Sequence, residues 1–137
     1  MTKIFLDTNV ILDFILEREG ADDATDILQL GEDKQIELAV SFLTMANTAY
    51  VVHKGHTQDE LYGILSDLSD MLEILPMDQT QFTNALARPA NDFEDVLQYE
   101  CAKACGCEAI ITRNRKHFSF AELPVLTPAE FLQQTQS

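Results

Sequence analysis

Acidic side chains lie in two distant parts of the chain, at positions where a carboxylate needs a partner. Asp7 ends a short apolar run, Ile4–Leu6, and Asp92, Glu94 and Asp95 follow one another much later. A carboxylate at the end of a buried strand costs free energy unless a cation or hydrogen-bond donors satisfy it. If the fold brings the two groups together, they predict a divalent-metal site, and metal-dependent phosphodiester chemistry is the leading function.

The oxygen atoms needed for such a site are present. Mg²⁺ and Mn²⁺ take oxygen ligands, commonly one or two carboxylates together with water and substrate phosphate. Asp7 and Asp95 would supply the carboxylates, and Asn114, which follows a later apolar run, would supply a neutral oxygen. A bound ion lowers the pKa of its water and neutralises charge on the transition state of phosphodiester cleavage.

Each acidic group also has a purely structural interpretation. Asp7 could cap the helix that follows it, although the next two residues, both polar, could do the same; this redundancy favours a functional role for Asp7. Asp92 could cap a later helix, with Glu94 and Asp95 complementing the positive end of the helix dipole. Taken alone, the later acidic group fits capping better than catalysis, and Glu94 is the acid expected to point to solvent.

Positive charge is concentrated in one short segment. Three of the nine lysines and arginines fall at Arg113, Arg115 and Lys116, in a chain whose formal net charge is −14. This segment is the obvious place for a phosphate backbone, and a solvated loop that offsets local acidity explains it equally well. The net charge excludes nucleic-acid binding by bulk electrostatics, so any contact with RNA must be local. It also suits a basic partner, or simply solubility.

Strand and helix patterns alternate and predict an α/β fold, with a parallel sheet covered on both faces. Strands are expected at 3–6, 37–40, 73–75, 109–112 and 124–126. In the first half, helices are expected at 10–17, at 22–30 ending at Gly31, from a Ser41 cap to about Lys54, and from a Thr57 cap to about Met71. In the second half, helices are expected from Asp78 to about Leu86, from Asp92 to Ala104, and from Pro128 after a Thr127 cap. The polar tail 133–137 is expected to be frayed.

The predicted sheet has an edge where ligands bind, beyond the carboxyl ends of its strands. Asp7 follows the first strand and Asn114 follows the fourth, so both are expected at that edge. The pattern leaves open which edge the helix from Asp92 faces at its start. A crossover helix that began at the far end would keep Asp95 away from Asp7.

The remaining composition narrows the class of protein. The 137 residues predict one domain, 1–137, and neither a signal peptide nor the roughly 20-residue apolar run of a membrane span is found. We therefore expect a cytoplasmic protein. Three cysteines, at 101, 105 and 107, are expected to be reduced and buried. No glycine-rich nucleotide-binding motif and no G-x-S-x-G occurs, and Asn9 breaks the D-x-D of aspartyl-phosphate hydrolases.

Four motifs together resemble the PIN domain family, in its bacterial VapC-like branch. They are LDTNVILD at the start, DFED-x-x-Q in a late helix, IITRN-x-x-x-F after it, and LTP-x-E-F-L at the end. The resemblance covers essentially the whole chain and implies a three-layer α/β/α sandwich with a central parallel sheet. It also implies an endoribonuclease that depends on Mg²⁺ or Mn²⁺ and acts on single-stranded or structured RNA. Many single-domain bacterial members are toxins, often homodimers, that a small antitoxin protein neutralises.

The resemblance assigns roles to individual residues. Asp7 matches the first metal ligand, Asp95 matches the acid that reaches the cleft from the late helix, and Asn114 matches the polar residue after Thr-Arg. Asp92 is typical of this branch and is a further candidate metal ligand. The remaining candidates are expected to bind substrate: Thr8, Asn9, Arg113, Arg115, Lys116 and His117.

Two positions depart from the family pattern. Asn47 stands where PIN nucleases usually carry a glutamate, and His117 stands where many carry an aspartate. Fewer charged ligands weaken metal binding, although His117 could act as a base or donate to phosphate near neutral pH. The alternative to a nuclease is therefore a catalytically weak or inactive PIN-fold module that binds a protein partner.

Overall fold

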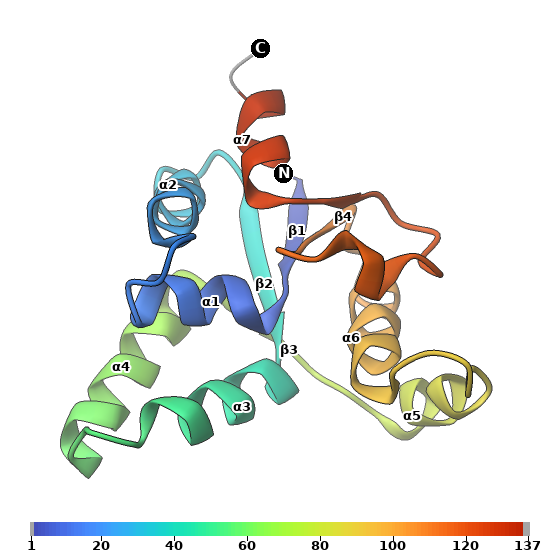
Figure 1. Cartoon of the computed structure of the whole chain (residues 1–137), viewed down its shortest axis with the longest axis horizontal. Helices are drawn as coiled ribbons and strands as arrows, with labels where there is room; N and C mark the ends of the chain where they lie inside the picture. The colour runs from blue at the N-terminus through green and yellow to red at the C-terminus, as the bar shows by residue number, and fades with distance from the viewer. Residues whose placement is uncertain (1, 136–137) are drawn as a thin grey trace.

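The computed structural model describes residues 2–135, which form a five-stranded parallel sheet with helices on both faces (Figure 1). The strand order is β3-β2-β1-β4-β5, and every neighbouring pair is parallel. The predicted α/β class and parallel sheet are thus confirmed. The strands are β1 (Lys3–Leu6), β2 (Glu37–Ser41), β3 (Glu73–Leu75), β4 (Ala109–Ile111) and β5 (Val125–Leu126).

Helices connect these strands, as parallel pairing requires. The α-helices are α1 (Thr8–Ile15), α2 (Ala21–Glu32), α3 (Phe42–Val52), α4 (Gln58–Met71), α5 (Gln79–Leu86), α6 (Phe93–Ala104) and α7 (Pro128–Thr135), and a 3₁₀ helix, η1, covers Arg115–Phe118. None of the described helices is both long enough and apolar enough to cross a membrane.

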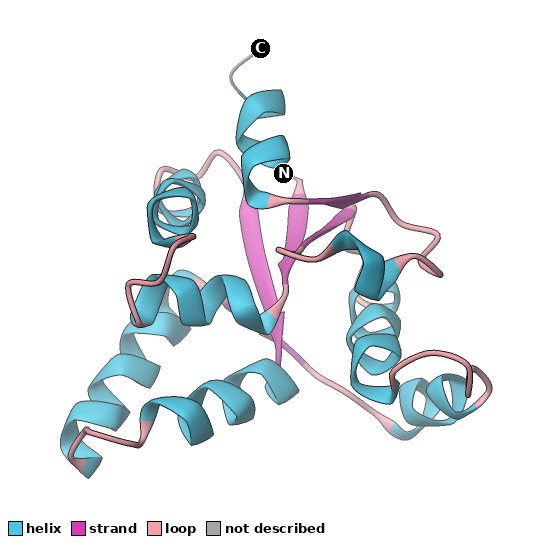
Figure 2. Cartoon of the chain, viewed as in Figure 1, coloured by secondary structure: helices cyan, strands magenta, loops and turns pink. Residues whose placement is uncertain are grey.

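Alternate strand side chains point to opposite faces of the sheet and build two cores. On one face Ile4 and Leu6 of β1 pack with residues from α1, α2, α4 and α7. On the other face Phe5 packs with Tyr99 and Cys101 of α6. Figure 1 and Figure 2 show the resulting layers, with α1 to α4 on one side of the sheet and α5 and α6 on the other.

The order of the strands reverses next to β1. The chain runs from β1 to β2 and β3 on one side, then crosses to β4 and β5 on the other. The backbone N–H of Asp7 donates to the Ile111 carbonyl over 2.9 Å, so the carboxyl ends of β1 and β4 meet at this switch point. Ligands of open α/β sheets bind in the crevice at such a point.

Helix α6 begins at this same edge of the sheet. Lys3 Nζ, at the amino end of β1, donates to the Cys105 carbonyl at the far end of α6 over 3.3 Å. The possibility that this helix begins at the far edge is therefore wrong. The chain leaves β3 at the carboxyl edge, and α6 must return to the amino edge before β4 can run parallel to β1.

Most predicted element ends agree with the structure within two residues, but the end of α2 does not follow the expected rule. A stop at Gly31 was predicted, and the helix continues to Glu32. A Cβ on Gly31 would lie 2.6 Å from Leu38 Cδ1. This glycine therefore permits close packing of α2 on β2, and it does not terminate the helix.

Two other local predictions need correction. The tail was expected to be frayed from residue 133, but α7 runs to Thr135, whose hydroxyl donates to the Leu132 carbonyl over 2.9 Å. The last two residues of that predicted tail lie outside the described range. Helix η1 was not predicted at all; it forms because buried Phe118 anchors the segment in the core beside Phe5.

The expectation of buried cysteines is confirmed for two of the three. Cys101 and Cys107 are buried, Cys105 is partly buried, and all three are free thiols. Burial raises the pKa of Cys101 and of Cys107 to about 12, so both thiols are protonated at neutral pH. They serve as small apolar core residues.

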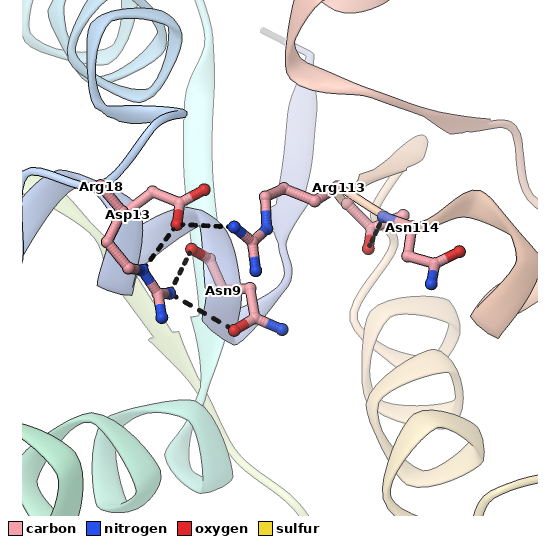
Figure 3. A network of polar contacts seen from close by, with 6 residues as sticks. Asn9, Asp13, Arg18, Arg113 and Asn114 are labelled. Atoms are coloured by element: carbon pink, nitrogen blue, oxygen red, sulfur yellow. Dashed lines mark hydrogen bonds and ion pairs between the residues drawn. The ribbon is translucent and has the colours of Figure 1, made fainter.

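Asp13 is a buried carboxylate on α1 that joins two arginines from different parts of the chain. Its Oδ1 accepts from Arg18 Nε over 2.9 Å and pairs with Arg113 Nη1 over 3.2 Å (Figure 3). Arg18 Nη2 also lies 3.5 Å from the carbonyl and from Oδ1 of Asn9. Since a buried charge is stable only when paired, this carboxylate fixes α1 against the segment that follows β4.

We predict that Asp13→Asn lowers the free energy of unfolding by about 1–3 kcal/mol, because two charge-assisted contacts to a buried carboxylate are lost. The measurement is urea denaturation followed by circular dichroism. Asp26→Asn, at an exposed position of α2, is the matched control and should change stability by less than about 0.5 kcal/mol. Equal midpoints for the two variants would contradict a clamping role for Asp13.

Candidate functional site

A pocket of about 480 Å³ opens at the carboxyl edge of the sheet, at the switch point beside β1. Its walls come from α1, α3, the start of α6 and η1. The lining residues are Asp7, Thr8, Asn9, Leu12, Asn47, Tyr50, Val51, Asp92, Glu94, Asp95 and His117. The fold therefore brings together acidic residues that are far apart in the sequence, a meeting that the sequence pattern alone had left open.

Asp7 is held at the floor of this pocket by two hydrogen bonds. Its Oδ1 accepts from the Thr8 backbone N–H and its Oδ2 accepts from the Thr112 hydroxyl, each over 2.9 Å. Asp7 therefore caps α1 and lines the pocket at once, so the structural and functional interpretations are compatible. Burial raises the pKa of Asp7, although the bonds from Thr112 and Thr8 act in the opposite direction.

Asp95 approaches the same pocket from the first turn of α6. Loss of solvent and the neighbouring charge of Asp92 raise its pKa to about 6, and the charge of Asp7 adds to the shift. Asp92 Oδ1 accepts from the Asp95 backbone N–H over 3.1 Å, so Asp92 caps α6 as the structural interpretation proposed. Two carboxylates that repel each other in a pocket form an arrangement that a cation stabilises.

A buried polar network supports the pocket from below. Gln98 Nε2 donates to Thr44 Oγ1 over 2.9 Å, and Ser41 Oγ donates to Gln98 Oε1 over 2.6 Å. The hydroxyls of Thr8 and Thr44 share a further bond of 2.8 Å. These four side chains are almost inaccessible, and they join α1, α3 and α6, the three helices whose ends form the pocket.

Asn47 and Glu94 meet across the pocket. Asn47 Nδ2, on α3, donates to Glu94 Oε1, on α6, over 2.8 Å. Glu94 is solvent-exposed, as expected, but its carboxylate is turned toward the opposite wall. Asn47 therefore donates a hydrogen bond where the family pattern would place an acid.

The basic segment lies outside the pocket lining. Arg113 pairs with Asp13, and Arg115 Nη1 pairs with Glu130 Oε2 over 3.1 Å. Lys116 is exposed and forms no ion pair with any residue of the described range. The two arginines are thus committed to the scaffold in this conformation, and the expected phosphate-binding surface is reduced mainly to Lys116 and the neighbouring His117.

Asn114 also lies outside the lining. Its Oδ1 accepts from the Lys116 backbone N–H over 3.2 Å, and its Nδ2 lies 3.1 Å from His117 Nε2. The oxygen expected to reach a metal ion is therefore used to cap η1. Asn114 orients His117, which does line the pocket.

The donors fit an open site for a hard divalent cation. Within residues 2–135, no three His, Cys, Asp or Glu side chains converge into a ready-made metal cage. Asp7 and Asp95 nevertheless offer carboxylate oxygens to an accessible pocket. Mg²⁺ and Mn²⁺ commonly use one or two carboxylates and fill the remaining positions with water and phosphate, whereas a closed structural zinc site would need four converging ligands.

Residues 3–116 match the family model of the PIN domain. The chain belongs to the PIN domain family. The predicted resemblance to this family is thereby confirmed, and the five-stranded parallel sheet agrees with it. Metal dependence is typical of this family.

Individual relatives agree with this assignment. Ribonuclease VapC1 of Aquifex aeolicus (strain VF5) is 29% identical over 138 aligned positions, which cover 96% of this chain and 94% of that protein. A toxin–antitoxin complex from Klebsiella pneumoniae contains a chain that is 25% identical, with a TM-score of 0.68, covering 91% of this chain and 97% of that one. The structure of VapBC2 from Rickettsia felis, bound to a promoter DNA fragment, contains a chain that is 20% identical, with a TM-score of 0.71, covering 91% of this chain and 97% of that one. This last likeness supports the fold alone.

Two important residues of this PIN domain had no assigned role in the sequence analysis. Gln98 is a polar side chain on the buried face of α6, and Thr112 ends an apolar strand as Asp7 does. Both signals are present in the sequence, because a polar residue within an apolar stripe needs a partner. Which partner each one has depends on the neighbouring strand or helix, and periodicity does not provide that information.

We predict that the stability of the metal-free protein depends on Asp95 and on pH. In the folded protein the pKa of Asp95 is raised from 3.8 to about 6. The stabilisation that the protonated side chain gives the folded state is therefore complete below about pH 4, and it is lost as the pH rises through about 6. Asp95→Asn should therefore be more stable than wild type at pH 7.5, by about 0.5–1 kcal/mol after solvent screening, and equally stable at pH 4.

The measurement is thermal denaturation in chelator across this pH range. Asp67→Asn, at an exposed position of α4, is the control and should show no such pH-dependent gain. A wild type more stable than Asp95→Asn at pH 7.5 would contradict the assigned repulsion.

Proposed function

We propose that this PIN protein is an endoribonuclease that depends on Mg²⁺ or Mn²⁺. The observation that carries the proposal is the pair Asp7 and Asp95, brought to one pocket at the switch point of the sheet. Neither carboxylate forms an ion pair within residues 2–135. The pair is therefore free to bind a cation, and the similarity to Ribonuclease VapC1 supports RNA as the substrate.

The chain's own residues hold the ion and orient the substrate. When bound, the ion supplies positive charge that activates water and stabilises negative charge on a phosphodiester. Asp7 and Asp95 would hold it, with Asp92 as a further acid at the same helix start. The Thr112 hydroxyl and the Thr8 N–H fix the carboxylate of Asp7 in one orientation.

His117 and the pocket floor are proposed to contact the RNA. His117 lines the pocket, and its imidazole can donate a hydrogen bond to a phosphate oxygen. Thr8 and Asn9 offer neutral polar groups next to Asp7. Lys116 adds positive charge outside the pocket, while Arg113 and Arg115 would contribute only after their ion pairs open.

The biological role proposed is that of the toxin in a toxin–antitoxin pair. Structures with the same fold include the Klebsiella pneumoniae toxin–antitoxin complex. The net charge of −14 favours a partner that presents basic residues. A homodimer and a small antitoxin protein are part of this proposal.

A catalytically weak or inactive module that binds a protein partner is the second candidate. The observations that favour it are the amide of Asn47 and the imidazole of His117 at two positions where acids were expected. This module would keep the fold and bind its partner protein without cleaving RNA.

We predict that Asp7→Asn reduces RNA cleavage in Mn²⁺ by about 100-fold or more, because the ion loses a charged ligand at the reacting phosphate. The assay uses single-stranded RNA and purified protein, with Asp67→Asn as a control that retains activity. Equal cleavage by wild type and Asp7→Asn, or none with either metal, would contradict a nuclease.

We further predict that expression of the chain arrests bacterial growth and that Asp7→Asn abolishes the arrest. If a short reading frame adjoins this gene, its co-expression should restore growth with the wild-type chain. Arrest that persists undiminished in Asp7→Asn would instead favour the partner-binding module, because that function does not need the metal site.

A further inference from the structure

Helix α3 lacks the acid that a PIN nuclease usually presents to the pocket, and the structure shows what replaces it. The Asn47 amide reaches across the pocket and donates to Glu94 Oε1 over 2.8 Å. The carboxylate of Glu94 is thus held next to position 47, although Glu94 belongs to α6 on the opposite wall of the pocket.

This contact is the outer part of a larger construction. Asn47 lies three residues after Thr44 on α3, and Glu94 lies four residues before Gln98 on α6. Residues at these spacings share one face of a helix. Two hydrogen bonds therefore join the same faces of α3 and α6. The bond between Gln98 and Thr44 is buried, and the bond between Asn47 and Glu94 lies about one helical turn further toward solvent.

The buried contact fixes the separation at which the outer residues meet. Gln98 is almost inaccessible and is bonded to both Ser41 and Thr44, so α3 and α6 are fixed relative to each other at this level. Because α3 and α6 are held together there, Asn47 and Glu94, one helical turn further toward solvent, face each other. Their bond follows from the scaffold and does not depend on a chance arrangement of two flexible surface side chains.

Capping does not account for the position of Glu94. Asp92 already accepts from the backbone at the start of α6, and an exposed glutamate loses side-chain entropy when it is held in one orientation. Its carboxylate lines the same pocket as Asp7 and Asp95. An amide can donate to a carboxylate at any pH without cancelling its charge, which an arginine or lysine partner would do.

We propose that Glu94 provides the third carboxylate charge of the cation site in place of the acid missing from α3, and that Asn47 is the residue that positions it. This rests on the metal-dependent function proposed above. The charge acts on the ion directly or through the ion's water shell, which Mg²⁺ largely retains. In this proposal the acid is carried by α6, at Glu94, and the amide of Asn47 on α3 holds it in place.

The experiment measures Mn²⁺ affinity by isothermal titration calorimetry, with RNA cleavage as a second readout. Glu94→Gln removes the charge but keeps the shape, and should weaken Mn²⁺ binding by about 10-fold or more. Asn47→Leu keeps all the charges but removes the donor, and should weaken binding by roughly 3- to 10-fold. Glu108→Gln, at an exposed position outside the pocket, is the control and should leave the affinity unchanged.

The decisive variant exchanges the two side chains. In the double variant Asn47→Glu with Glu94→Gln, the amide and the carboxylate change walls, while charge and hydrogen bond are both restored. Its Mn²⁺ affinity should return to within about threefold of wild type. Circular dichroism melting checks that every variant remains folded.

Failure of this inference can be told apart from failure of the proposed function. If Asp7→Asn and Asp95→Asn abolish Mn²⁺ binding while Glu94→Gln binds within twofold of wild type, Glu94 plays no part in the site, and the nuclease proposal stands. If Glu94→Gln weakens binding but Asn47→Leu binds Mn²⁺ as tightly as wild type, Asn47 does not position the charge; if the double variant does not recover, the charge cannot be supplied from α3. If the wild type binds no Mn²⁺, both proposals fall.

Discussion

The burial of one carboxylate at the junction of two strands is the constraint around which this molecule is arranged. Asp7 lies where the carboxyl ends of β1 and β4 meet, and the Thr8 backbone N–H and the Thr112 hydroxyl each hold one of its carboxylate oxygens. These donors make its burial tolerable, but they leave a net negative charge facing the pocket. Placing Asp95 opposite it raises the cost further. This repulsion at the switch point of the sheet is the physical basis of the proposed cation site.

A buried network of neutral side chains that satisfy one another holds together the elements around the pocket. The network of Gln98, Thr44, Ser41 and Thr8 connects three helices without a charged group. The buried carboxylate of Asp13 also connects separate parts of the chain, because it pairs with Arg18 after α1 and with Arg113 after β4 (Figure 3). The acids of the pocket are therefore carried by elements whose separation is fixed, as a site that binds a small ion requires.

The general fold followed from local patterns in the sequence. Alternating strand and helix signals specified a covered parallel sheet, and cap residues such as Ser41, Thr57 and Asp78 marked helix starts that the structure confirms. Asp7 at the end of β1 was predictable because a strand end in such a sheet faces the ligand edge. The meeting of Asp7 with Asp95 required the family resemblance, since the sequence pattern did not fix which edge the start of α6 faces.

The remaining details depended on side-chain partners that no local pattern encodes. The basic segment looked like a phosphate-binding surface, yet Arg113 and Arg115 find acids on α1 and α7. Gly31 looked like a helix stop and proved to be a packing contact. Asn47 looked like a lost acid, and only the folded chain shows that it donates to Glu94 across the pocket.

The most direct test of a cation site at the switch point is anomalous diffraction from crystals soaked in Mn²⁺, recorded at the manganese absorption edge. We predict a single anomalous peak in the pocket between the carboxylates of Asp7 and Asp95, and its disappearance in Asp95→Asn. Crystals that diffract well with no peak in this pocket, or with a peak that persists unchanged in Asp95→Asn, would contradict the proposed site.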